Sequence, residues 1–292
     1  MNGLQRTNPI PVFALLGSLG LIIMFCSDTV LLAVSLPGAL CLRALLDGRR
    51  GLREAALLCI LPLITALLNP LFNHNGVTVL LILNDRPITL EAVFYGLSMG
   101  VMILAVLLWS RSFSQLMTTD KLLYLFGSAS PKLSLILSMT LRYIPLFRRQ
   151  TQKTDRAQQA MGLYKDDTLA DRLRGALRVF SVMVTWALEN GAVTADSMTA
   201  RGYGVGHRTQ FALLRFRRSD GLLLGAVVLL CGITVWAAAA GRIGTVWYPV
   251  YSQPQPGMLG TAAYLAYGLL AFIPAILEGG EALRWKSLLS EI

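Results

Sequence analysis

Charged side chains are scarce in this chain. Asp, Glu, Lys and Arg make up only 14% of its 292 residues, whereas soluble domains carry about 25%. Hydrophobic residues make up 54%, and the mean hydropathy is +0.58. The composition excludes an ordinary soluble domain and predicts an all-α protein that crosses a membrane several times, because helices satisfy their own backbone groups in lipid.

Residues that build catalytic or metal sites are also few. The chain has two histidines and four cysteines, without a C-x-x-C pair, and no Walker A motif. His74 has no second histidine near it in the sequence, so we predict a turn there rather than a metal site. The cysteines are interpreted as small buried apolar residues. We therefore expect no catalytic, cofactor-binding or metal-binding residue.

The excess positive charge is concentrated in residues 111–219. This segment has 17 Lys and Arg against 7 Asp and Glu, a net charge of +10, and the rest of the chain is balanced. Nucleic-acid binding and a cytoplasmic segment under the positive-inside bias are the two possible explanations. In so apolar a chain the cytoplasmic segment is favoured, and we expect no nucleic-acid partner.

About six apolar runs approach the length of a membrane-spanning helix. They are residues 11–26, 29–46, 55–71, 91–109, 220–240 and 260–278. Arginines crowd the connection 43–53, whereas loops 72–90 and 241–259 each have one cation. The bias in these loops predicts a multi-pass protein with both termini in the cytoplasm. We divide it into transmembrane helices 1–4 (1–110), a cytoplasmic coupling region (111–219) and transmembrane helices 5–6 (220–292).

Four smaller features accompany the spans. Pro62 predicts a kink in the third span. Gly96 and Gly100 form a G-x-x-x-G face for close packing on another helix, of this chain or of a partner. Asp28 and Glu91 are expected at membrane interfaces, because each falls at the end of a predicted span.

Two long helical patterns stand out inside the basic segment, at about 131–161 and 168–200. Each begins apolar and turns polar towards its end, after a shorter amphipathic element at 113–127. Thr168 is positioned to cap the start of the second helix. Gly162 and Gly202 follow the two helices as C′ glycines.

The second long helix ends in ADSMTARGYG (195–204), with Arg201 between Ala200 and Gly202. An arginine there can act as a counter-charge to the helix C-terminus. Alternatively, small flanking residues let the guanidinium project from a thin knob and pair with a carboxylate on another protein. The first long helix ends similarly in Ala160, Met161 and Gly162.

The stretches TLRYIPLFRRQTQKTDRAQQAMG (140–162) and ENGAVTADSMTARGYG (189–204) resemble the two coupling helices of the transmembrane T component of energy-coupling-factor (ECF) transporters, a family that includes cobalt- and biotin-type proteins. NPLFNHNGVTVL (69–80) and WYPVYS (247–252) are also similar to that family. The resemblance covers nearly the whole chain.

The resemblance implies a non-enzymatic subunit of an ABC importer in the cell membrane. Such a subunit links a membrane-embedded substrate-binding S subunit, which takes up a vitamin or metal ion, to two ABC ATPases that bind the ATP. Each coupling helix ends in a small-Arg-small motif that docks in one ATPase. Here Ala200, Arg201 and Gly202 match the motif, whereas the other tip (160–162) has methionine in place of arginine. Arg156 is a candidate substitute cation.

Two other function classes fit the sequence less well. An integral-membrane enzyme would need an acid, base or metal cluster at one membrane face, and the sequence has none. A self-contained secondary transporter would show internal repeats with broken helices. The spans divide four and two around the basic segment, which gives no repeat, so the coupling subunit is preferred.

Overall fold

The structure is a computed structural model, and it describes residue 4 and residues 7–73, 76–83, 86–163, 168–206 and 216–290. His74 lies outside these ranges. The chain divides into two compact units, one made of Met1–Leu122 and Leu214–Ile292, the other of Leu123–Leu213.

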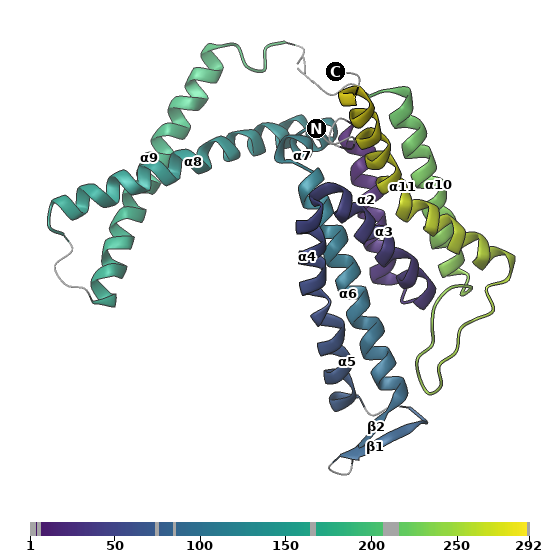
Figure 1. Ribbon diagram of the computed structural model, residues 1–292. Coiled ribbons are helices and arrows are strands. Elements are labelled where there is room, and N and C mark those ends of the chain that lie inside the picture. The colour runs from purple at the N-terminus through teal and green to yellow at the C-terminus, as the bar shows by residue number, and fades with distance from the viewer. Residues whose placement is uncertain are drawn as a thin grey trace. The chain divides into compact units, whose positions relative to one another are not determined.

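The first unit is built from helices, most of them apolar (Figure 1). They are α2 (Pro9–Phe25), α3 (Thr29–Asp47), α4 (Arg49–Leu58), α5 (Ile60–Phe72), α6 (Leu90–Leu116), α10 (Arg218–Ala239) and α11 (Gly257–Ser290). Among the described residues, five segments are long and apolar enough to cross a membrane: α3, α4 with α5, α6, α10 and α11. α2 has 17 residues and rises roughly 25 Å, so it is shorter than the other five. The predicted all-α, multi-pass fold is confirmed.

The third predicted span is broken near its start. α4 ends at Leu58 and α5 begins at Ile60, with Cys59 between them. Pro62 lacks an N–H, and its ring crowds the carbonyl of the residue four positions earlier, which is Leu58. The kink predicted from Pro62 is therefore confirmed, one turn before the proline.

The glycine face of α6 packs against α5 of the same chain. A Cβ added at Gly96 would lie 2.6 Å from the Thr65 carbonyl oxygen, and one at Gly100 would collide with Pro62 and Thr65. The two helices lie side by side in Figure 1. The predicted close packing is thus confirmed, and its partner is within this chain.

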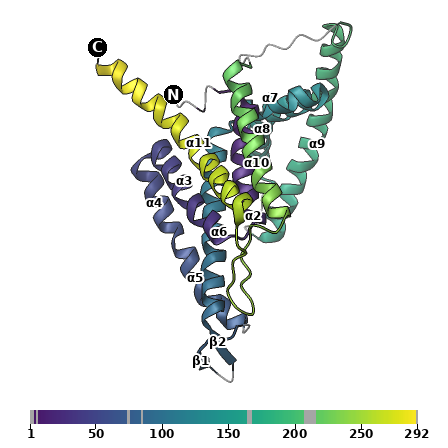
Figure 2. The same cartoon turned by 90° about the vertical axis from the view of Figure 1, so that its right-hand side faces the viewer.

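A short β-hairpin occupies the loop between α5 and α6. Strands β1 (Val79–Leu83) and β2 (Arg86–Thr89) pair antiparallel, and both views show them at the ends of the two helices (Figures 1 and 2). We predicted only a connector there. The aliphatic run VTVLLIL at 77–83 favours a strand but is too short for a spanning helix.

Asp28 caps the start of α3 and Glu91 lies in the first turn of α6, so both fall at helix ends, and both side chains are buried. Their position at a membrane interface stays a prediction. Asp28 is 0% exposed and Glu91 is 7% exposed. The Asp28 carboxylate accepts hydrogen bonds from Val30 N at 2.8 Å, Gly244 N at 3.0 Å and the Tyr264 hydroxyl at 2.8 Å. A carboxylate that accepts several hydrogen bonds can be buried. The position of a residue at the end of a span does not show in the sequence that such donors are present.

The cysteines are free, but none of them is fully buried as predicted. Cys41 and Cys59 are exposed, and Cys26 and Cys231 are half-buried. In a membrane-spanning unit apolar residues cover the outer surface as well as the core, so apolar surroundings do not predict burial.

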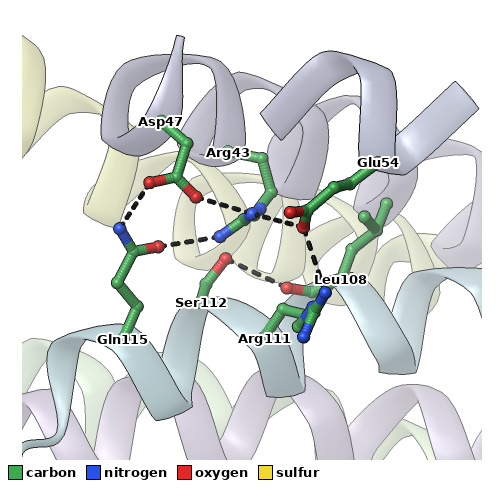
Figure 3. A network of polar contacts seen from close by, with 7 residues as sticks. All are labelled: Arg43, Asp47, Glu54, Leu108, Arg111, Ser112 and Gln115. Carbon is green, nitrogen blue, oxygen red and sulfur yellow. Dashed lines mark hydrogen bonds and ion pairs between the residues drawn. The ribbon is translucent and has the colours of Figure 1, made fainter. Parts of the chain in front are cut away.

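A polar network joins α3, α4 and α6 (Figure 3). The Arg43 guanidinium contacts Asp47 at 2.6 Å and Glu54 at 3.2 Å, and it donates to Gln115 Oε1 at 2.8 Å. Glu54 also pairs with Arg111 at 3.2 Å. In the sequence Arg43 stands out only as part of a basic loop, yet its side chain is 4% exposed.

The connections of the first unit gather at two ends. At one end, Leu4 N donates to Glu278 at 3.2 Å, and Lys121, just after α6, donates to the Leu4 carbonyl at 2.9 Å. At the other end, Tyr95 near the start of α6 contacts Trp247 in the α10–α11 loop, with ring centroids 5.9 Å apart. The N-terminal residue Leu4, the end of α6 and the C-terminal part of α11 therefore share one side.

The boundary between the two units falls within α7 (Thr119–Ala129). The second unit contains α7 from Leu123 onward, together with α8 (Pro131–Ala160) and α9 (Leu169–Ala200). The bounds of α8 and α9 match the two predicted long helices, and Thr168 caps α9 through a hydrogen bond from Asp171 N at 3.4 Å. The element predicted at 113–127 is wrong at its start, because α6 continues to Leu116.

α8 and α9 cross in Figure 1. Phe147 of α8 meets Trp186 of α9 edge to face, with ring centroids 5.3 Å apart. The hydroxyls of Tyr143 and Thr194 are hydrogen-bonded at 2.7 Å. An aromatic and a polar contact therefore hold the crossing.

Candidate functional site

The α8 tip ends in a glycine-stopped turn. Gly162 has a φ of 68°; its N–H donates to the Gln159 carbonyl at 3.0 Å, and Leu163 N donates to Gln158 O at 3.2 Å. These two bonds define a Schellman motif, which satisfies carbonyls that the helix end leaves unpaired.

The α9 tip repeats this geometry. Gly202 has a φ of 73°, its N–H donates to Thr199 O at 3.0 Å, and Tyr203 N donates to Met198 O at 3.0 Å. Both predicted C′ glycines are therefore confirmed. Met161 and Arg201 occupy the same C-cap position, with φ and ψ of −80° and 1° at Met161 and −82° and 5° at Arg201.

All six residues predicted at the tips are exposed. They are Ala160, Met161, Gly162, Ala200, Arg201 and Gly202. A Cβ added at either glycine would meet no described atom within 4 Å, so both tips are thin. Arg201 forms no ion pair with any residue that the structure describes. Arg201 is therefore an exposed cation at a helix C-terminus, where the helix dipole favours positive charge.

Arg156, the candidate substitute for the arginine missing at Met161, is exposed. It lies five positions earlier on α8, which is about 140° around the helix axis. Its side chain therefore leaves a different face of the helix, and the α8 tip itself presents an exposed methionine.

An apolar groove of about 810 Å³ lies between α8 and α9. Its α9 side includes Val179 and Met183, whereas Phe147 contributes from α8. Phe180 and Leu188, which also line it, are 66% and 72% exposed. Water would solvate so apolar a groove poorly.

A second, more polar cleft of about 430 Å³ lies between the same helices. Arg201 lines it from the α9 tip, and Arg142 lines it from the apolar half of α8. Arg142 has no role that the sequence alone predicts, because the two arginines are far apart in the chain and only the crossing of the helices brings them to one cleft.

A metal site receives no support from the side chains. Within the described ranges, no three His, Cys, Asp or Glu residues cluster in a way that could hold a metal ion.

Comparison with known proteins identifies the family. The family model described as cobalt transport protein (CbiQ) matches residues 4–212. The chain belongs to this family. The match covers both helix tips and every spanning segment up to α6.

Curated relatives agree with this assignment. The energy-coupling factor transporter transmembrane protein EcfT of Listeria innocua is 35% identical over 107 residues, which cover 36% of this chain and 40% of the relative. EcfT of Brevibacillus brevis is 29% identical over 155 residues, covering 50% and 58%. The chain thus spans about half the length of the curated relatives it matches. The predicted resemblance to T components of ECF transporters is confirmed.

Proposed function

We propose that this chain couples ATP hydrolysis by two ABC ATPase subunits to a membrane-embedded substrate-binding S subunit, for uptake of a vitamin or metal ion. The observation that carries the proposal is the pair of long helices that end in the same exposed, glycine-stopped turn. Rigid helices can transmit a displacement of their ends, and both ends are open to a partner. Membership in the family supports this role.

The docking residues of the α9 tip are Ala200, Arg201 and Gly202. The guanidinium pairs with a carboxylate in a groove of one ATPase, because arginine binds carboxylates through two parallel hydrogen bonds. At the α8 tip, Ala160, Met161 and Gly162 dock in the second ATPase by apolar packing. Met161 is 67% exposed, and methionine adapts well to irregular apolar surfaces.

The apolar groove between α8 and α9 faces the membrane partner. Exposed aromatic and aliphatic residues such as Phe180 and Leu188 mark interaction surfaces in contact with protein or lipid. An S subunit or the bilayer would remove this groove from water.

The protein lies in the cell membrane with both termini in the cytoplasm. The shared side of Leu4, the end of α6 and Glu278 supports termini on one side. The arginines at 43–53 lie in the connection between α3 and α4, and the positive-inside bias assigns that connection to the cytoplasm. The chain binds no cofactor and performs no catalysis itself, since ATP is held by the ATPases.

The test is recovery of the ATPases with the affinity-purified chain. Arg201→Glu places a negative charge at a helix C-terminus and opposite an acidic groove, so we expect recovery to fall at least about tenfold. Arg148→Glu is the matched control, because Arg148 is exposed on α8 and lies outside the polar cleft. Membrane insertion should be unchanged in both variants. Full recovery and transport with Arg201→Glu would remove the docking role.

A further inference from the structure

The α9 tip shares a concave surface with an arginine from the other long helix. Arg142 and Arg201 line one cleft together with polar side chains of both helices. These polar residues are Ser138, Tyr143, Asn190, Thr194 and Ser197. Tyr143 and Thr194, which are hydrogen-bonded to each other, both line this cleft. The cleft therefore lies at the crossing of α8 and α9.

Within the described residues, the two guanidinium groups have no counter-ion. Both arginines are exposed, and across the part of the chain that the structure describes neither forms an ion pair. Two solvated arginines that stood apart on a convex, basic surface would not indicate a binding site. Here they line a common cleft with hydroxyl and amide groups, and a concave surface of one charge sign attracts an anion more strongly than isolated charges do.

We propose that Arg142 and Arg201 together bind one acidic segment of a partner ATPase, so that α8 completes the docking site at the α9 tip. This inference rests on the proposed function, which gives Arg201 to an ATPase. An anion that reaches Arg201 from that partner enters the cleft that Arg142 also lines. The planar guanidinium fork suits a carboxylate at each position.

The shared site has a mechanical consequence. The α8 tip carries Met161 and offers no cation of its own, but α8 contributes Arg142 to the site on α9. One acidic segment then holds both helices close to the Tyr143–Thr194 contact. A movement of that ATPase displaces the crossing as a unit rather than one helix alone.

The experiment compares Arg142→Gln with Arg148→Gln in the complete complex, measured as ATPase retention on the immobilised chain in neutral detergent. Both residues are exposed on α8, and only Arg142 is among those lining the cleft. Arg142→Gln should weaken retention about tenfold, as expected for loss of a charge-assisted hydrogen bond, and Arg148→Gln should not. The double variant Arg142→Gln/Arg201→Gln should lose less than the product of the two single losses, because both arginines bind the same segment.

The outcomes separate this inference from the function on which it rests. If Arg201→Gln loses the ATPases and Arg142→Gln behaves like the control, the shared site is wrong and the proposed function stands. If neither variant loses them, both fail. If the retention lost in the double variant equals the product of the two single losses, the two arginines bind separate partners, and the proposal of one shared segment is wrong. An effect of Arg142→Gln that appears only when anionic lipid is added assigns the cleft to a lipid headgroup and also overturns the proposal.

Discussion

The Tyr143 hydroxyl lies 2.7 Å from the Thr194 hydroxyl and joins α8 to α9 at their crossing. One turn along α8 from Tyr143, Phe147 contacts Trp186. The apolar groove includes Phe147, and the polar cleft includes Tyr143 and Thr194. The crossing therefore contributes side chains to both surfaces, and a change in the crossing alters both.

The aromatic contact is expected to matter more than the hydroxyl contact. Trp186→Ala removes a large ring, with an aromatic pair worth about 0.5–1.5 kcal/mol beyond its buried area. Tyr143→Phe keeps the ring and removes one neutral hydrogen bond, worth about 1 kcal/mol. We expect Trp186→Ala to reduce both transport and ATPase recovery severalfold, because both surfaces depend on the crossing, and Tyr143→Phe to have a small effect on either. Equal transport in the two variants would contradict this order.

The backbone of the α9 tip should be sensitive to side chains at position 202. Gly202→Ala forces alanine into the left-handed region at a φ of 73°, at a cost of about 1 kcal/mol, which loosens the Schellman turn. Gly191→Ala is the control: Gly191 lies inside α9, is not among the positive-φ glycines, and a Cβ there meets no described atom within 4 Å. Amide hydrogen exchange at residues 198–203 should rise in the first variant only. Unchanged exchange in Gly202→Ala would mean that the turn does not depend on glycine.

Local signals in the sequence predicted the tips accurately. Gly162 and Gly202 were identified because a glycine directly after a long helical pattern has few other structural reasons to be there. Thr168 was identified from its spacing to Asp171. Each of these signals involves residues only a few positions apart. The groups that interact can therefore be recognised from the local sequence alone.

Long-range partners could not be predicted in the same way. Asp28 meets Gly244 and Tyr264, more than two hundred residues away, and no local pattern encodes that pairing. Arg43 carried a weak signal in its i, i+4 spacing to Asp47. The cluster of arginines in the same loop obscured it, because the positive-inside bias explains arginines there without a partner.

The buried Arg43 should be important for stability. Arg43→Met leaves Asp47 without a cation and leaves Glu54 with only the exposed Arg111. Because these carboxylates sit on residues whose side chains are 30% and 45% exposed, water can take up part of the charge, and we expect a loss of about 2–3 kcal/mol rather than the larger cost at a fully buried pair. Arg111→Gln should lose less than about 1 kcal/mol, since its side chain is 62% exposed. Thermal unfolding of the purified chain in detergent measures both, and a similar fall in melting temperature would contradict the burial argument.

The α5–α6 contact should not tolerate even a methyl group. In Gly96→Ala the Cβ would lie 2.6 Å from the Thr65 carbonyl oxygen, so the helices must separate, at a cost of about 1–3 kcal/mol. Gly232→Ala in α10 is the counterpart, because a Cβ there meets no described atom within 4 Å; it should be neutral or stabilising by up to about 1 kcal/mol. The same melting experiment distinguishes them, and an equally stable Gly96→Ala protein would show that α5 can move away without cost.

Restoring an arginine at the α8 tip should be tolerated. Met161 is 67% exposed and has nearly the same backbone angles as Arg201, so Met161→Arg fits without strain and gains about 0.3–1 kcal/mol from the negative helix C-terminus. We expect ATPase recovery to be retained with Met161→Arg and reduced with Met161→Glu, which reverses the sign of the charge at the same position. If Met161→Arg loses the ATPases while Met161→Leu keeps them, the α8 tip requires an apolar side chain. The expected tolerance of arginine is then wrong, and the two tips bind their ATPases by different chemistry.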